Sequence, residues 1–157
     1  IGESAFSGCI SLTQIAIPSQ VVNIADESFY TCSNLEVFVV DSNNMQYASL
    51  NGILFTKDFR TLIQYPANKV GTTYSVPASV ISIRNKAFYQ CKSLTKILLP
   101  SSVASIGYKS FFDCASLTQI TIPANVKTIG EHAFSGCLQL DSSIRKELDK
   151  TYGNSIF

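Results

Sequence analysis

Apolar residues recur along the chain in a pattern with a period of 23 residues. The stretch Ile83–Pro100, I-R-N-K-A-F-Y-Q-C-K-S-L-T-K-I-L-L-P, returns almost residue for residue at Ile106–Pro123. Its phenylalanine and its cysteine recur at the same step, apart from one gap of 59 residues: Phe6, Phe29, Phe88, Phe111 and Phe134; Cys9, Cys32, Cys91, Cys114 and Cys137. A fixed period of about 20–50 residues is typical of a solenoid, in which each repeat packs on its neighbours.

The shared unit is I-G-x-x-A-F-x-x-C-x-x-L-x-x-I-x-I-P-x-x-V-x-x, and it predicts one short strand per coil. Ile15 and Ile17 alternate with polar or small residues, which indicates a strand with one buried face. Pro18 follows this strand, and proline favours a strand boundary because it donates no hydrogen bond to a ladder. Val21 and Ile24 lie three positions apart and should line the opposite wall of the coil.

The repeat breaks between Asp41 and Pro77. Residues Ile53–Phe55 and Leu62–Tyr65 form two apolar runs around a charged turn, which predicts an inserted β-hairpin. Asp41–Ser49 is polar and rich in asparagine, which predicts a loop. The apolar residues of the hairpin exceed what one coil needs, so we expect some to pack against the flank of the solenoid or against a partner.

The rest of the irregular segment still follows the repeat when it is counted back from Pro77. Tyr65 then takes the phenylalanine position and Asn68 the cysteine position. Tyr74 and Val76 take the strand positions. Residues 41–77 are therefore expected to be one degenerate coil that carries an insertion.

After Leu140 the strand motif stops, and residues 141–157 predict a helical cap. Ser143 or Ser142 could be the N-cap of a short helix that runs through Lys150, with Gly153 as its stop. Ile144 and Leu148 are four positions apart and would share one face of this helix.

The first residues, in contrast, have the sequence of the middle of a repeat. We therefore expect residues 1–157 to form a single repeat domain of about six coils within a longer protein.

The five cysteines are predicted to be free, reduced and buried. Equivalent positions on stacked coils lie about 4.8 Å apart with parallel side chains, whereas a disulfide needs converging Cβ atoms roughly 3.5–4.5 Å apart. A metal site is not expected, because there is no close cysteine pair and the chain has one histidine.

The A-F-x-x-C-x-x-L-x-x-I-x-I-P signature resembles the BspA-like, or treponemal-type, leucine-rich repeat. The resemblance covers Ile1–Leu140, and the inserted D-S-N-N-M-Q-Y-A-S-L-N-G-I-L-F-T-K-D resembles a variant coil of that family. It implies a curved, right-handed, β-rich α/β leucine-rich repeat solenoid. It also implies a surface or secreted protein, mostly of mucosa-associated bacteria and some protozoan parasites, with adhesion to host or bacterial proteins as the usual role.

Residues suited to catalysis are sparse. His132, the single histidine, falls in a column that should be solvated, with Ser4, Glu27, Lys86 and Lys109. No G-x-S-x-G motif or glycine-rich phosphate loop is present. A polysaccharide-cleaving solenoid would need carboxylates gathered on one wall, and only Glu36 is acidic among the outward strand positions. We therefore expect neither an enzyme nor a cofactor.

Charge is balanced overall at +1 but unevenly distributed. Residues 1–56 hold five acidic residues and no lysine or arginine, whereas residues 59–112 hold seven basic residues and no acidic one. This basic band could face a polyanion such as a sulfated glycan, or it could be an ordinary solvated surface. Nucleic acid is not expected as a partner, because no reader motif is present. Membrane insertion is not expected either, because no long apolar run exists.

The candidate binding surface is the outward face of the strands. Alignment on Ile15 and Ile17 places two columns of residues there: Gln14, Ala16, Val37, Val39, Thr73, Ser75, Lys96, Leu98, Gln119 and Thr121. The apolar members, Val37, Val39 and Leu98, flank the irregular coil. Either the hairpin covers them, or they form the centre of a protein-binding surface with Lys96 on its rim. A passive spacer that displays other domains is the alternative function.

Overall fold

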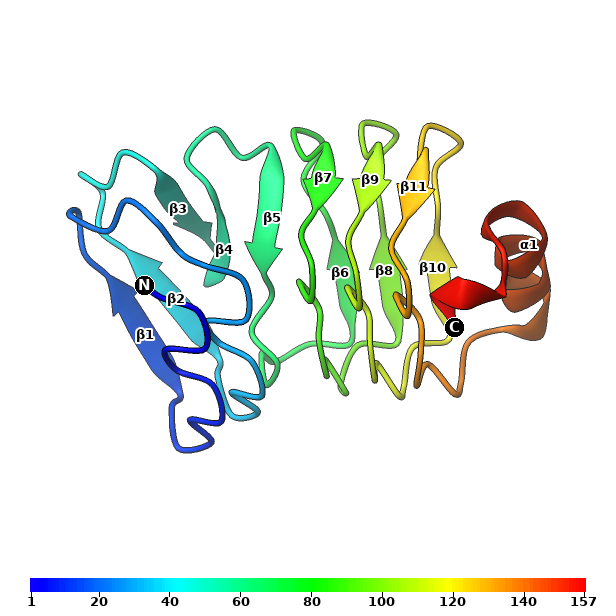
Figure 1. The fold of residues 1–157 in the computed structure, drawn as a ribbon, viewed down its shortest axis with the longest axis horizontal. Helices are drawn as coiled ribbons and strands as arrows, with labels where there is room; N and C mark the ends of the chain where they lie inside the picture. Colours follow the sequence, from blue (N-terminus) through cyan, green and yellow to red (C-terminus); the bar gives the residue numbers. More distant parts are fainter.

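Stacked coils form a solenoid that is closed at one end by a helix, and the computed structural model describes residues 1–157 of it (Figure 1). The longer parallel strands make two sheets: β1 (Gln14–Ile17) with β2 (Val37–Val40), and β6 (Thr73–Ser75), β8 (Lys96–Leu98) and β10 (Gln119–Thr121). A third sheet runs along the other side of the coils: β3 (Tyr47–Leu50), β4 (Ile53–Thr56), β5 (Thr61–Gln64), β7 (Ser82–Ile83), β9 (Ser105–Ile106) and β11 (Thr128–Ile129). The predicted leucine-rich repeat solenoid is thus confirmed.

The predicted register is also confirmed. Tyr74, Ile97 and Ile120 are paired across β6, β8 and β10, and Ile15 is paired with Phe38 across β1 and β2. All of these except Tyr74 are buried, as one-faced strands require.

The aromatic column fills the middle of the coils. Tyr65 stacks on Phe88 with ring centroids 5.3 Å apart, and Phe88 and Phe134 each lie 5.1 Å from Phe111. Tyr65 therefore takes the phenylalanine position, as predicted. Asn68, predicted at the cysteine position, is exposed, and its side chain donates to Glu36.

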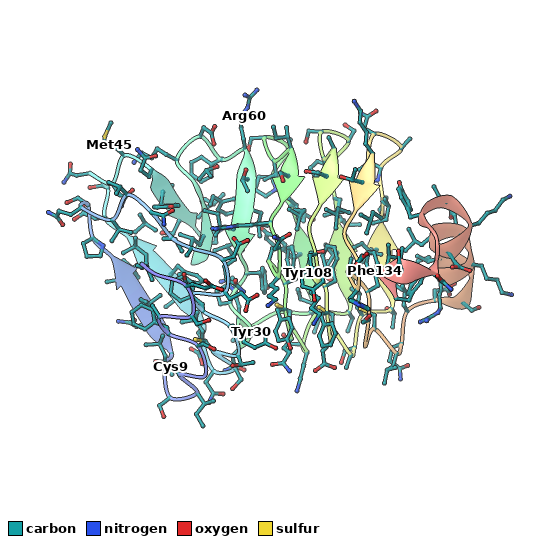
Figure 2. The ribbon with its side chains drawn as sticks, viewed as in Figure 1. Cys9, Tyr30, Met45, Arg60, Tyr108 and Phe134 are labelled. Atoms are coloured by element: carbon teal, nitrogen blue, oxygen red, sulfur yellow. The ribbon has the colours of Figure 1, made fainter.

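Each buried cysteine lies under the preceding coil. Cys114 and Cys137 donate their thiols to the carbonyls of Phe88 and Phe111 at 3.0 and 3.1 Å. All five cysteines are free, as predicted, and four are buried. The prediction of burial is wrong for Cys9, which is exposed because this chain places no coil over its first repeat (Figure 2).

The inserted hairpin is present, but it is larger than predicted. β4 and β5 are antiparallel, and β3 adds a further antiparallel strand at 47–50 where a loop was predicted. Asn51 and Gly52 join β3 to β4 with φ of 52° and 79°. Two positive φ values in a two-residue turn suit the right-handed twist of a hairpin, and Asn-Gly is its strongest short sequence signal.

Strands β4 and β5 form a wall between two hydrophobic cores. Leu54 and Ile63 pack into an N-terminal core of 10 buried residues. Ile53, Phe55 and Leu62 pack into a C-terminal core of 26 buried residues. Burial on both faces explains why these strands have continuous apolar runs and no alternation. The hairpin thus packs inside the molecule and is not an appendage on its flank.

Helix α1 (Ser142–Tyr152) and the short 3₁₀ helix η1 (Asn154–Ile156) cover the last coil. Leu148 is buried and Ile144 packs against the same core, as predicted from their spacing. Gly153 ends the helix with φ 81°, also as predicted. The predicted N-cap is wrong, because the carboxylate of Asp141, one residue earlier, accepts from the Ser143 N–H at 2.8 Å. Neither helix is long and apolar enough to cross a membrane.

Candidate protein-binding surface

The outward side chains of β1, β2, β6, β8 and β10 form what we call the long-strand face. Backbone register aligns Thr73, Lys96 and Gln119 in one column, and Ser75, Leu98 and Thr121 in the next. On the other sheet, Gln14 is paired with Val37, and Ala16 with Val39. All of these are exposed or half-buried, so the structure places every candidate residue at the surface.

The hairpin divides the long-strand face into two parts. The Phe38 N–H donates to the Gly52 carbonyl at 2.9 Å, so the β3–β4 turn occupies the edge of β2 where β6 would otherwise pair. A Cβ atom on Gly52 would lie 2.8 Å from the Val37 side chain, which shows how closely this turn covers Val37. Val39 stays 50% exposed, and Leu98 belongs to the other sheet. The three apolar candidates therefore do not lie on one continuous sheet.

A groove borders the C-terminal part of the long-strand face. One section of about 320 Å³ is lined by β8, β10 and the start of α1, including Lys96, Leu98 and Gln119. A second section of about 550 Å³ lies between the end of β10 and the face of α1. Ile120, Thr121 and Ile144 line both sections. Sequence reasoning missed this groove, because it depends on how α1 leaves the last coil.

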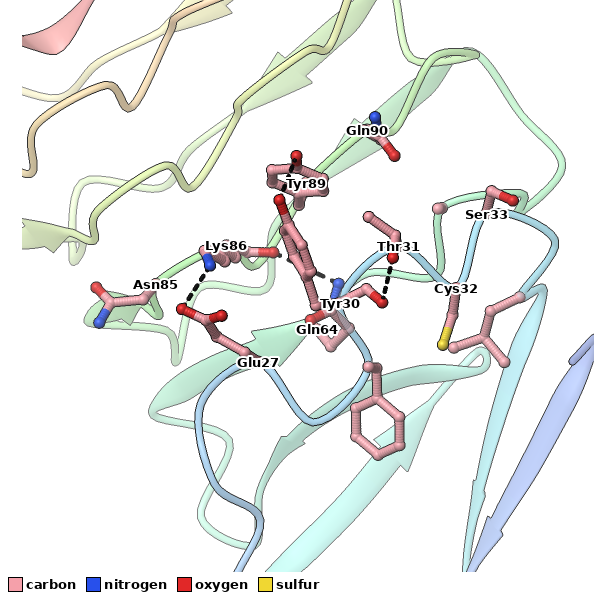
Figure 3. A pocket seen from close by; sticks show the side chains of 13 residues that line it. Glu27, Tyr30, Thr31, Cys32, Ser33, Gln64, Asn85, Lys86, Tyr89 and Gln90 are labelled. Atoms are coloured by element: carbon pink, nitrogen blue, oxygen red, sulfur yellow. Dashed lines mark hydrogen bonds and ion pairs between the residues drawn. The ribbon is translucent and has the colours of Figure 1, made fainter. Parts of the chain in front are cut away.

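Opposite charges meet where the second coil contacts the coil that follows the hairpin (Figure 3). The ammonium of Lys86 lies 2.6 Å from a Glu27 carboxylate oxygen and 4.3 Å from the centre of the Tyr30 ring. The hydroxyls of Tyr30 and Tyr89 are 3.0 Å apart. Burial of Tyr89 and its hydrogen bond with Tyr30 raise the pKa of the Tyr89 phenol well above its usual value.

A shortened turn brings these two coils together. Leu62 is paired with Ile83, and Tyr65 stacks on Phe88, so the irregular coil has two fewer residues between these positions. Lys86 can therefore reach across to Glu27. The prediction of a solvated column is wrong for Lys86, which is only 9% exposed.

Several residues of the basic band are thus engaged within the molecule. Arg84 lies 2.6 Å from Asp26 and also donates to the Ile24 carbonyl. The ammonium of Lys109 lies about 5 Å from the rings of Tyr108 and Phe112. Two of the seven basic residues of the band thus pair with acidic residues of the second coil, which accounts for part of the charge asymmetry without an external polyanion.

The histidine and the cysteines have few features of catalytic groups. His132 is exposed, and its ring lies 3.3 Å from the Ser135 hydroxyl and beside the Tyr108 ring. Burial raises the pKa of the Cys114 thiol, and a hydrogen bond with Cys114 together with burial raises that of Cys137. Such thiols stay protonated at neutral pH and are poor nucleophiles.

Solved structures of several bacterial proteins are similar to this chain. The pneumococcal vaccine antigen PcpA has a TM-score of 0.79 and 29% identity over 82% of this chain and 32% of its own. A leucine-rich cell surface protein of Faecalibacterium prausnitzii has a TM-score of 0.76 and 30% identity over 82% of this chain and 34% of its own. A leucine-rich repeat protein of Eubacterium ventriosum has a TM-score of 0.66 and 30% identity over 83% of this chain and 41% of its own.

The chain thus spans about a third of the length of the first two structures. The comparison with curated protein sequences finds no match. The family model for the BspA-type leucine-rich repeat region matches residues 1–62 and 67–157 with six copies. This chain therefore belongs to the BspA-type leucine-rich repeat family.

Proposed function

We propose that this chain is a non-catalytic protein-binding module of a surface or secreted protein, and that its long-strand face contacts a host or bacterial surface protein. The observation that carries the proposal is the register of β6, β8 and β10. It aligns six outward side chains in two columns, of which four are exposed and two, Lys96 and Leu98, are half-buried.

The chemistry of these columns suits a protein partner. Threonine, serine and glutamine side chains donate and accept hydrogen bonds. Leu98 supplies apolar area in the middle strand, and Lys96 supplies one charge beside it. An apolar centre with a polar rim is typical of protein interfaces. The surface location is supported by the similarity to the leucine-rich cell surface protein of Faecalibacterium prausnitzii.

The alternatives have less support. A sulfated glycan would need a free basic band, and Arg84, Lys86 and Lys109 are engaged within the molecule. A passive spacer would carry the same face without contacting anything, so the two functions differ in one measurable respect. Changes on the long-strand face weaken binding only if the face is an interface.

The experiment compares two charge-altered variants of the chain. The face variant Thr73→Glu/Ser75→Glu adds two carboxylates to exposed positions of β6. The control variant Asn125→Glu/Thr128→Glu adds two at exposed positions on the other side of the coils. Binding to a panel of purified host extracellular proteins and bacterial surface proteins is measured by biolayer interferometry.

We expect the face variant to lose affinity for a bound protein by about tenfold or more, because two carboxylates would lose their water at the interface without a partner. The control should change affinity by less than about twofold. Equal effects of the two variants, with circular dichroism unchanged, would reject the long-strand face. Absence of binding to every member of the panel would favour the spacer.

A further inference from the structure

Strand β10 ends the sheet β10-β8-β6 with one unpaired edge, and α1 does not close it. The other two strands of that sheet, β6 and β8, are each paired with the strand of the next coil. The Lys96 N–H donates to the Thr72 carbonyl, and the Gln119 N–H to the Thr95 carbonyl. The last coil begins the same pattern with Asp141, whose N–H donates to the Thr118 carbonyl at 3.0 Å. Helix α1 then starts at Ser142, so the chain turns away after one hydrogen bond.

The backbone groups that face this open edge belong to Ile120 and Ile122. A parallel ladder uses alternate residues on each side of a strand, and Gln119 already donates to β8. In the equivalent place two coils earlier, the Val76 N–H donates to the Leu98 carbonyl of the next coil. Ile122 has no such partner in the structure. An unpaired strand edge is a template for another strand.

The groove beside α1 leads to this edge. Ile120, Thr121 and Ile122 form one wall of its larger section, and Ile144, Leu148 and Tyr152 are on the helix wall. Its two sections of about 320 and 550 Å³ are within the usual range of ligand clefts, about 300–1,000 Å³. Ile122 is half-buried, whereas its equivalents Val76 and Leu99 are buried at 6% exposure. The last coil therefore lacks the apolar cover that the repeat supplies elsewhere.

We propose that the edge of β10 is a strand-addition site, which binds an extended polypeptide segment of a partner protein in the groove between β10 and α1. The repeat itself defines the chemistry of the occupant. A strand that pairs with such an edge in this chain reads polar, apolar, polar, apolar, proline, as in Q-I-T-I-P at 119–123. Main-chain hydrogen bonds supply affinity in this mode, and alternate side chains supply specificity.

The test uses the intact chain and a synthetic peptide, S-L-T-Q-I-T-I-P-A, with the sequence of residues 116–124. Binding is measured by fluorescence anisotropy with a labelled peptide, and its location by hydrogen exchange read out by NMR. We expect the amides of Ile120 and Ile122 to exchange about tenfold more slowly in the complex, because they gain carbonyl partners.

Two controls separate backbone pairing from adhesion of an apolar peptide. The first control peptide is methylated on two backbone nitrogens, that of its glutamine and that of the threonine after its first isoleucine. It lacks the donors that would face β10, so it should bind about tenfold more weakly. Thr121→Arg should fill the groove and weaken binding about tenfold. Ser75→Arg places the same side chain in the same column on β6, away from the groove, and should leave peptide affinity within about twofold.

The proposal is overturned if the peptide does not bind at millimolar concentration, or if the methylated peptide binds equally well. Exchange protection elsewhere than at Ile120 and Ile122 would also overturn it. The outcome is independent of the long-strand face, because the face variant Thr73→Glu/Ser75→Glu changes neither wall of the groove.

Discussion

Replacing Leu54 by alanine tests the position of the hairpin between the two cores. Leu54 has no exposed surface and packs in the smaller core, which has only 10 buried residues. The change removes three carbon groups at about 0.8 kcal/mol each, and the cavity left behind raises the total cost to about 3–4 kcal/mol. This is a large share of a typical domain stability of about 5–15 kcal/mol.

The assay is urea unfolding followed by far-ultraviolet circular dichroism, which gives the free energy of unfolding from the midpoint and slope. Leu50→Ala is the matched control, because Leu50 lies in the same insertion but is 42% exposed. It should cost less than about 1 kcal/mol. Equal costs for the two variants would contradict the two-sided wall. Excision of residues 52–61 should abolish cooperative unfolding, because it removes part of this wall. A cooperative transition in the excised chain would also contradict the two-sided wall.

Three further experiments test the packing of the coils, two by urea unfolding of variants and one by thiol labelling. Gly130→Ala should cost about 1–3 kcal/mol, because a Cβ there would lie 2.4 Å from the backbone of the preceding coil. Gly2→Ala should be near neutral, because a Cβ there would have nothing within 4 Å. Similar costs for the two variants would contradict the close approach of the coils at Gly130. Native protein should react with a thiol reagent rapidly at Cys9 alone, and denatured protein at all five cysteines; rapid reaction of a second native thiol would refute the buried column. Lys86→Met should cost about 1–2 kcal/mol, because it removes the partner of Glu27. The Lys92 side chain is 65% exposed, so Lys92→Met should cost less than about 0.5 kcal/mol. Equal costs for the two variants would count against the Lys86–Glu27 pair.

High pH provides another prediction, because the pKa values of buried acids are raised in the folded chain. Burial raises the pKa of Cys114, and burial also raises that of Tyr65 to about 12. In the unfolded chain these groups lose protons near pH 8.5 and 10, while the folded chain retains them. Their contribution to stability is therefore complete below these values and is lost as pH rises. We expect the free energy of unfolding to fall by up to about 1.4 kcal/mol per pH unit for each such group, and a stability that is constant from pH 7 to 11 would contradict this.

The regular coils could be predicted from the sequence because each fixed position has a single physical role. Phe88 and its counterparts stack, Ile97 and its counterparts face inward, and Pro100 follows its strand, so periodicity alone gives the register. The cap was predicted in place, but its N-cap is not a serine, and its helix runs two residues beyond Lys150, to Tyr152. Asp141 takes the N-cap position because its carboxylate accepts a hydrogen bond from the backbone N–H of Ser143.

The irregular coil could be predicted only in part, because its environment is not periodic. The run Ile53–Phe55 indicated a strand, but no pattern shows that Leu54 and Phe55 enter different cores. The Asn51–Gly52 dipeptide indicates a hairpin turn and therefore a strand before it, which is β3. The polar composition of the preceding segment instead favoured a loop there. The pairing of Lys86 with Glu27 depends on a turn shortened by two residues, which is visible only once Leu62 is paired with Ile83.

Site-specific photo-crosslinking tests the central claim, that the long-strand face is the protein-binding surface, most directly. A photoreactive phenylalanine is placed at Thr73 on β6 or at Thr128 on β11, both exposed and on opposite sides of the coils. Each chain is irradiated with a protein that binds the unmodified chain in the panel experiment. The account predicts a crosslinked complex from position 73 and little from position 128. Crosslinking mainly from position 128, or equally from both, would contradict it.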